Sequence, residues 1–171
     1  MKITLKLTLF IALIYSLSIS CKKQDPVEYN NSIIKLQREA IFSIDNLKKN
    51  IDSYSTAYQE ESIKNINKSY DSSYFLISRN IEVLKSMKSY KDDDTLRIAA
   101  IALFNVYIDI LENYYKPLIE IYKLPASQFT DADHEAVANY DFSANKKLDN
   151  SFKKFSEIQV KFARKYKLLL E

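Results

Sequence analysis

The chain has no glycine at any of its 171 positions, and this absence restricts its fold more than any other feature. Average usage of about 7% would give about 12 glycines in a chain of this length. Tight hairpins, phosphate-binding loops and dinucleotide-binding turns use glycine where the dihedral φ is positive or a ligand approaches the main chain. The composition therefore argues against these elements and favours long helices joined by simple connections.

Apolar residues recur at three- and four-residue steps over four segments, which is the pattern of amphipathic helices. We expect helices over residues 26–53, 57–89, 95–123 and 131–169. The connections between them are too short to cross the molecule, so neighbouring helices must run antiparallel. The predicted fold is all-α: an up-down-up-down four-helix bundle over residues 26–171, about 40 to 55 Å long at about 1.5 Å rise per residue.

Local patterns mark the expected helix starts. Asp25 supplies a side-chain cap, and Pro26 stands at the first helical position. Residues 56–59 have the spacing of a capping box, in which two side chains satisfy backbone N–H groups reciprocally, and Thr130, three residues before Asp133, is expected to cap the fourth helix. The three aspartates at 92–94 offer a cap for the third helix and complement the positive end of its dipole.

The third helix is expected to be the most buried, because its residues from Leu96 to Leu111 are apolar nearly all round. Pro117 lies inside it. Because proline lacks a backbone N–H and its ring clashes with the carbonyl four residues earlier, we expect a kink near Asn113. The kink is either a structural irregularity or the opening of a ligand cleft.

The N-terminal segment, residues 1–20, has the pattern of a secretory signal. Lys2 and Lys6 precede an uncharged stretch over 7–20 that ends in small residues. Crossing about 30 Å of hydrocarbon takes about 20 apolar residues, so this stretch is short for a membrane-spanning helix. We therefore expect a cleaved signal.

The only cysteine, Cys21, follows this signal directly. Ile19-Ser20-Cys21 resembles the end of a bacterial lipobox, in which the cysteine thiol receives a diacylglycerol and becomes the mature N-terminus. Ser18 stands where lipoboxes usually have leucine, which leaves open ordinary cleavage after Ser20 or an uncleaved anchor. The expected organisation is a signal over 1–20, then a lipidated cysteine and short tether over 21–25, with membrane attachment through the lipid.

Composition also excludes several kinds of site. A lone cysteine forms no internal disulfide and no cysteine-based zinc site. Loss of Lys2 and Lys6 with the signal would leave 23 basic residues against 22 acidic ones, without the basic stripe of nucleic-acid-binding proteins. The single histidine, His134, has no glutamate three residues before it, so a ferritin-like di-metal site is absent. We expect no metal, no cofactor and no nucleic-acid partner.

Two acidic clusters are the densest groups of potential metal ligands. Residues 131–135 read Asp-Ala-Asp-His-Glu, but successive helical residues point in different directions, so a favourable first helical turn explains them. The aspartates at 92–94 lack the glycine and the later glutamate of an EF-hand loop. A Ser-His-Asp arrangement would have to use His134 without a strand-turn-helix elbow. We expect no catalytic residues and no enzyme activity.

Tyrosine is unusually frequent, with 13 copies and no tryptophan. Its ring has few rotatable bonds and both an apolar and a polar part, which suits binding surfaces. Tyr114, Tyr115, Tyr122 and Tyr140 are therefore candidates for a ligand-binding or partner-binding surface. The alternative is packing at the edge of the core with the hydroxyl groups in water.

Residues 25–31, 111–119 and 155–166 together resemble a family of uncharacterised bacterial lipoproteins with helical-bundle domains, found in Bacteroidota and among spirochaete surface proteins. The resemblance implies a cell-envelope location, with anchoring in the outer membrane on its periplasmic or its surface face. It transfers no activity. We expect a lipid-anchored, non-catalytic interaction or structural module with an envelope protein as partner. The alternative is a module that binds a small ligand or envelope polymer in an aromatic cleft between helices.

Overall fold

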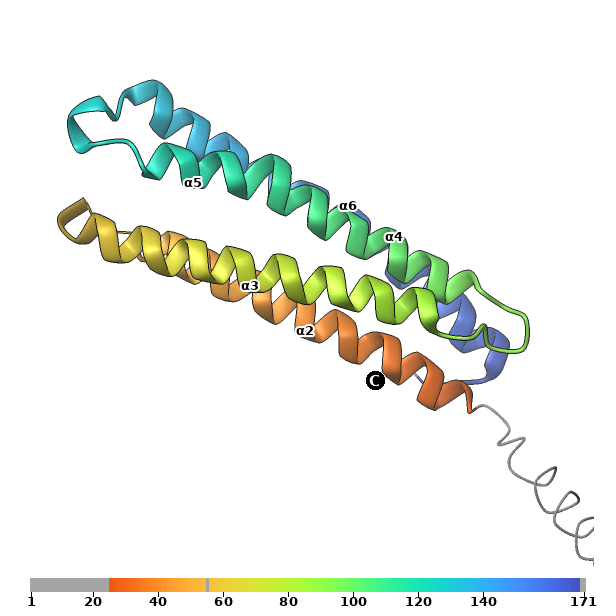
Figure 1. Ribbon diagram of the computed structural model, residues 1–171. Helices are drawn as coiled ribbons and strands as arrows, with labels where there is room; N and C mark the ends of the chain where they lie inside the picture. The colour runs from red at the N-terminus through yellow and green to blue at the C-terminus, as the bar shows by residue number, and fades with distance from the viewer. Residues whose placement is uncertain (1–24, 55, 170–171) are drawn as a thin grey trace, which may run out of the picture.

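The computed structural model describes residues 25–54 and 56–169, and it confirms the all-α bundle (Figure 1). The described chain forms four long helical segments, with no strand beyond an isolated bridge between Tyr90 and Asp93. The predicted signal over 1–20 and Cys21 lie outside the described residues and stay predictions.

The long segments follow the predicted boundaries closely. The first two are α2 (Pro26–Asp52) and α3 (Gln59–Ser86), the third is a direct succession of α4 (Thr95–Ile110), the π-helix η2 (Leu111–Tyr115) and α5 (Lys116–Tyr122), and the fourth is α6 (Asp131–Tyr166). The 3-10 turns η1 (Thr56–Tyr58) and η3 (Ala126–Gln128) lie in two of the connections. Helix α3 ends three residues earlier than predicted, and α6 does so as well.

The bundle has two ends that differ in construction. At the basal end, where α2 begins, the ring of Tyr29 lies 5.7 Å from those of Tyr90 and Phe162, so the starts of α2 and α4 meet the ends of α3 and α6. At the distal end, formed by residues 53–54, 56–59 and 124–130, Tyr54 stacks on Tyr122. Figure 1 shows the long segments running to and fro between these two ends.

Each segment buries one stripe of apolar side chains along the bundle axis. Helix α4 is the most apolar, and its buried residues are Leu96, Ala99, Ala100, Leu103, Phe104, Tyr107 and Ile110. Burying one leucine or isoleucine side chain contributes about 1.5 to 3 kcal/mol. Two hydrogen bonds help to set the register of α3 against α2, because the buried Ser73 and Asn80 donate to the carbonyls of Ser43 and Leu36.

Of the four predicted helix caps, those at Asp25 and at residues 130–133 form as expected. The carboxylate of Asp25 accepts from the N–H of Val27 at 2.8 Å, and residues 130–133 form a capping box with bonds in both directions. The capping box predicted at residues 56–59 is wrong. Gln59 begins α3 after the turn η1, and its amide nitrogen donates instead to the carbonyls of Tyr122 and Leu124. A tertiary contact has replaced the local one.

The irregularity predicted around Pro117 is present as the π-helix η2. The N–H of Lys116 donates to the carbonyl of Leu111, five residues back rather than four. An inserted π turn lets a helix accommodate a residue that has no N–H to donate.

The expectation that the missing glycines exclude tight turns is wrong at one place. Lys91 and Asp92 have φ values of 49° and 63°, and Tyr90 and Asp93 exchange two backbone hydrogen bonds of 3.3 and 2.9 Å across them. A two-residue turn with both central φ angles positive normally contains glycine. The flanking Tyr90 and Asp93 are both buried, so tertiary contacts hold the turn in place despite the unfavourable backbone.

Candidate functional site

The structure places the four predicted tyrosines in different environments. Tyr115 is only 2% exposed and packs in the core, where burial raises the pKa of its hydroxyl. Tyr122 lies at the distal end. The ring centroid of Tyr114 lies 5.4 Å from the Nζ of Lys147 on α6. Tyr140 is partly buried and packs against the core. A partner cannot touch Tyr115 unless the bundle opens.

Aromatic stacking and backbone caps build the distal end. Tyr122 stacks between Tyr54, at 4.3 Å between ring centroids, and Phe129, at 6.4 Å, and Phe129 meets the ring of His134 edge-on at 4.6 Å. The hydroxyl of Tyr54 donates to the carbonyl of Tyr122, which also accepts from Gln59. These bonds satisfy carbonyl groups that the end of α5 leaves without helical partners.

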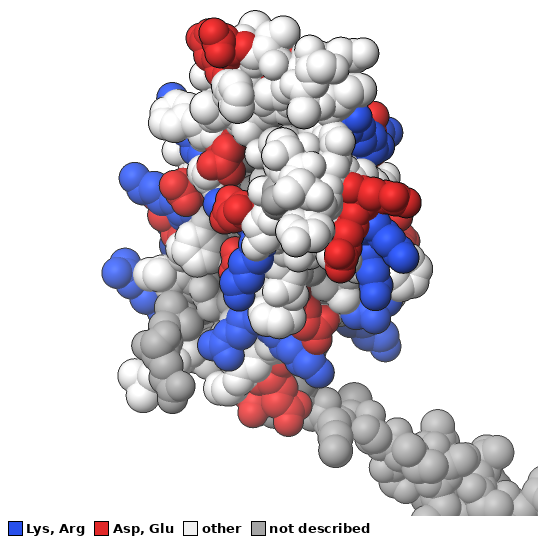
Figure 2. All heavy atoms as spheres, turned by 90° about the vertical axis from the view of Figure 1, so that its left-hand side faces the viewer, with Lys and Arg blue, Asp and Glu red and all other residues white. Residues whose placement is uncertain are grey.

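The distal end also lacks charge. Residues 53–59 and 124–130 include no acidic or basic side chain. Figure 2 looks onto this end and shows a band of uncharged atoms down its middle, with acidic side chains at the top and left of centre and Lys, Arg, Asp and Glu side chains on both sides and below. Tyr58 is 70% exposed here. The sequence could have indicated this surface, because both connections at this end, 53–59 and 124–130, lack charged residues.

A second candidate site is a shallow groove of about 510 Å³ between α3 and η2, which we call the aromatic groove. Its lining includes Tyr70, Tyr74 and Phe75 from α3 and Glu112 and Lys116 from the third segment. The hydroxyl of Tyr74 donates to the Oε1 of Glu112 at 3.0 Å, which raises the pKa of this tyrosine. The sequence could have indicated this groove through Phe75, a large apolar residue that lies outside the apolar stripe of α3 and is exposed.

The basal end carries the most perturbed carboxylate of the described chain, on Asp93. It accepts from the Nζ of Lys165 at 2.7 Å, from both the hydroxyl and the N–H of Thr95 at 2.6 and 3.1 Å, and from the hydroxyl of Tyr166 at 3.0 Å. The hydrogen bonds from Lys165 and then Thr95 lower the pKa of Asp93 far below its usual range.

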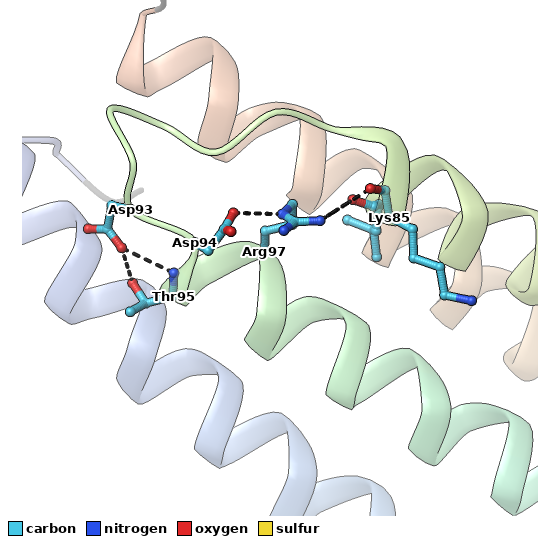
Figure 3. A network of polar contacts seen from close by, with 6 residues as sticks. Lys85, Asp93, Asp94, Thr95 and Arg97 are labelled. Carbon is cyan, nitrogen blue, oxygen red and sulfur yellow. Dashed lines mark hydrogen bonds and ion pairs between the residues drawn. The ribbon is translucent and has the colours of Figure 1, made fainter.

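Asp94, the last aspartate of the 92–94 run, makes a different contact from Asp93. Asp94 stands at the N-cap position of α4 without a side-chain cap bond and pairs with Arg97 instead, at 2.8 Å. Arg97 in turn donates to the carbonyl of Lys85 at 3.2 Å, near the end of α3 (Figure 3). The predicted capping by the 92–94 run therefore comes from Asp93, while Asp94 and Arg97 link α4 to α3. These carboxylates are engaged in structural contacts.

The acidic residues at 131–135 serve mainly as helix-start groups, with Asp133 bonded to Thr130. Over residues 25–54 and 56–169, no three His, Cys, Asp or Glu side chains gather closely enough to hold a metal ion. Nor does any helix in this part of the chain have the length and apolar character needed to cross a membrane.

Comparisons with protein-family models, with curated proteins and with solved structures gave no match.

Proposed function

We propose that this protein is a lipid-anchored, non-catalytic module of the cell envelope that presents its distal end to a partner protein. The observation that carries the proposal is the contrast between the two ends. The chain enters the bundle at Asp25, while the uncharged distal end, with Tyr58 exposed, lies at the far end of the long axis (Figure 1).

The dimensions suit such a role. Three residues, 22–24, lie between Cys21 and Asp25, which is a span of about 14 Å at full extension, so a lipid on Cys21 would hold the basal end close to the membrane. Helix α2 has 27 residues, which places the distal end about 40 Å further away. Surfaces without charge are favourable for partner binding, because burying an unpaired charge is costly and charged residues are depleted at the centre of interfaces.

The carboxylates with the clearest contacts support a structural rather than a catalytic role. Asp93 joins the connection after α3 to the start of α4 and the end of α6, and Asp133 caps α6. The single histidine packs its ring against Phe129. These groups stabilise helix ends.

Substitution of the cysteine tests the anchoring. In the Cys21→Ala variant, expressed in the native host, we expect loss of lipid labelling and of membrane association. Cell fractionation and incorporation of a labelled fatty acid measure both. Unchanged processing and unchanged association would show that the anchor is not this cysteine.

Site-specific cross-linking tests the distal interface. A photo-crosslinking amino acid in place of Tyr58 should capture a partner from intact envelopes, whereas the same group in place of Phe42, an exposed ring along the side of α2, should not. Mass spectrometry of the adducts identifies the partner. Equal capture at both positions, or capture only at position 42, would contradict the distal site.

The aromatic groove favours a second candidate function, the binding of an envelope polymer or small ligand. The lining combines three aromatic rings with the acidic residues Asp71 and Glu112 and with Lys116, which resembles the usual mixture of apolar walls and a few polar groups in ligand sites. Co-sedimentation with purified peptidoglycan tests this function. Phe75→Ala should weaken binding and Phe42→Ala should not; equal effects of both variants would count against the groove.

A further inference from the structure

A groove of about 610 Å³ lies between α4 and α6 near the basal end, separate from the aromatic groove and the distal end. Its walls are apolar. Ile98 and Ala102 project from α4, and Ile158 and Phe162 project from α6. Residues four apart lie on the same face of a helix, so each helix contributes a continuous apolar row.

Phe162 is buried at 2% exposure and forms the floor of the groove, while Ile98 on the row of α4 is left without cover by the described chain. The side chain of Ile98 is 57% exposed, although it stands on the most apolar helix of the bundle. Apolar surface left in water is unfavourable, so a ligand that covers it gains binding free energy. From position 95 to 102 the wall extends about 10 Å at 1.5 Å rise per residue, which is enough for part of an extended hydrocarbon chain.

The rim of the groove is cationic. Lys161 is an exposed residue of the lining and forms no ion pair with any residue in 25–54 or 56–169. Lys165 is bonded to Asp93, but its side chain is 60% exposed and its ammonium group can take another acceptor. Asp93 is the only acidic residue lining the groove, and its two oxygens already accept from Thr95, Lys165 and Tyr166.

From this combination we propose that the groove between α4 and α6 binds a long-chain fatty acid, with the hydrocarbon chain along the apolar rows and the carboxylate at Lys161 and Lys165. The ammonium groups of Lys161 and Lys165 outnumber the carboxylate of Asp93, so the rim has a net positive charge that complements one negative head group. A single apolar trough suits one acyl chain. The proposal goes beyond the envelope role and does not depend on attachment through Cys21.

Fluorescence titration tests the proposal directly. The protein is the mature chain from residue 21 with Cys21→Ser, which keeps the whole buried core from Tyr29 to Phe162. The probe is cis-parinaric acid, an intrinsically fluorescent fatty acid, used below its critical micelle concentration. We expect saturable binding at one site, and displacement by palmitate about tenfold better than by its methyl ester, which lacks the charge.

Variants locate the site. Ile98→Glu places a carboxylate in the groove and should weaken binding by about tenfold or more, since it removes apolar wall and repels the head group. Ala102→Trp fills the groove at an exposed position and should also abolish binding. Val83→Glu, at an exposed valine on α3, is the matched control for a new surface carboxylate. Circular dichroism confirms that each variant is folded.

A pair of lysine variants separates the head-group contact from the chain contact. Lys161→Gln should lower affinity for palmitate about three- to tenfold and leave that for the methyl ester unchanged, whereas Lys153→Gln, elsewhere on α6, should change neither. Unaltered binding in both Ile98→Glu and Ala102→Trp would overturn the site. Binding of anionic vesicles without binding of monomeric fatty acid would identify a membrane-facing surface instead. A dimer that Ile98→Glu dissociates, without fatty-acid binding, would identify a second copy as the occupant.

Discussion

The basal and distal ends of the bundle solve the same problem by different means. Both must close helix termini and connect antiparallel segments without glycine. The basal end uses a buried carboxylate, Asp93, which collects hydrogen bonds from α4 and α6, and it accepts an unfavourable backbone at Lys91 and Asp92. The distal end uses stacked rings and the amide of Gln59, with 3-10 turns and no positive φ angle among its described residues.

The basal and distal ends also differ in the charge of their connections. The basal connection over residues 87–94 carries five charged side chains, whereas the distal connections over 53–59 and 124–130 carry none. The basal end should respond to acid more strongly than the distal end, because Asp93 accepts several hydrogen bonds that lower its pKa, whereas the distal contacts are neutral amides and rings apart from the Asp133 cap. Variants that weaken one end at a time can test this contrast.

The largest expected effect follows removal of the basal carboxylate. Asp93→Ala should lower the free energy of unfolding by about 2 to 3 kcal/mol, because it leaves several donors without their acceptor in a nearly buried position. Urea denaturation followed by circular dichroism measures the change. Asp149→Ala, at an exposed position on α6, is the control and should stay within about 0.5 kcal/mol. Equal losses in both variants would contradict a specific role for Asp93.

A smaller loss is expected at the distal end. Gln59→Ala removes two hydrogen bonds to the carbonyls of Tyr122 and Leu124 and should cost about 1 to 2 kcal/mol by the same measurement. Gln128→Ala changes an exposed amide in the same region and serves as control. If Gln59→Ala matched Gln128→Ala, the amide bonds would not be closing this end.

The pH dependence of stability should distinguish the two ends. The pKa of Asp93 is lowered in the folded protein, so its contribution is complete above the unfolded-state pKa of about 4 and is lost as the pH falls toward the folded-state pKa. Wild type should therefore lose stability more steeply than Asp93→Asn between about pH 4 and pH 2. Gln59→Ala should keep the wild-type slope. Parallel curves for wild type and Asp93→Asn would contradict the assignment.

The smallest effect is a gain. Lys91→Gly should raise the free energy of unfolding by about 0.5 to 1 kcal/mol, since a left-handed residue other than glycine costs about 1 to 2 kcal/mol and the greater freedom of unfolded glycine offsets part of the benefit. Lys88→Gly, at a residue without positive φ, should destabilise or do nothing. A loss at position 91 would mean that the lysine side chain, 5.2 Å from the ring centroid of Tyr90, contributes more than the backbone strain costs.

Local patterns predicted the features that depend on neighbouring residues. The apolar periodicity located the four helical segments, and Asp25 and the 130–133 box located two helix starts, because each motif is completed within one turn. Pro117 predicted the irregularity in the third segment but not its π-helical form. Gln59 was assigned to the wrong partner because its amide reaches Tyr122 and Leu124, more than 60 residues away in sequence.

The candidate sites were less predictable, since each one combines side chains from two segments. Tyrosine frequency alone did not separate Tyr115, which is buried, from Tyr58, which is exposed. The aromatic groove joins Tyr74 to Glu112 across 38 residues, and the groove between α4 and α6 joins Ile98 to Phe162. Helical periodicity gives the face on which each residue lies but not the face that packs opposite it.

By itself, the sequence determined that this protein is a helical bundle without an internal disulfide, because periodicity, caps and composition act locally, and it marked Cys21 as a candidate for lipid attachment. Only the tertiary structure decided how the ends are closed and which surfaces stay open. Those choices depend on hydrogen bonds and ring contacts between distant segments. Such contacts also allowed Lys91 and Asp92 to form the one turn that the missing glycines had been expected to exclude.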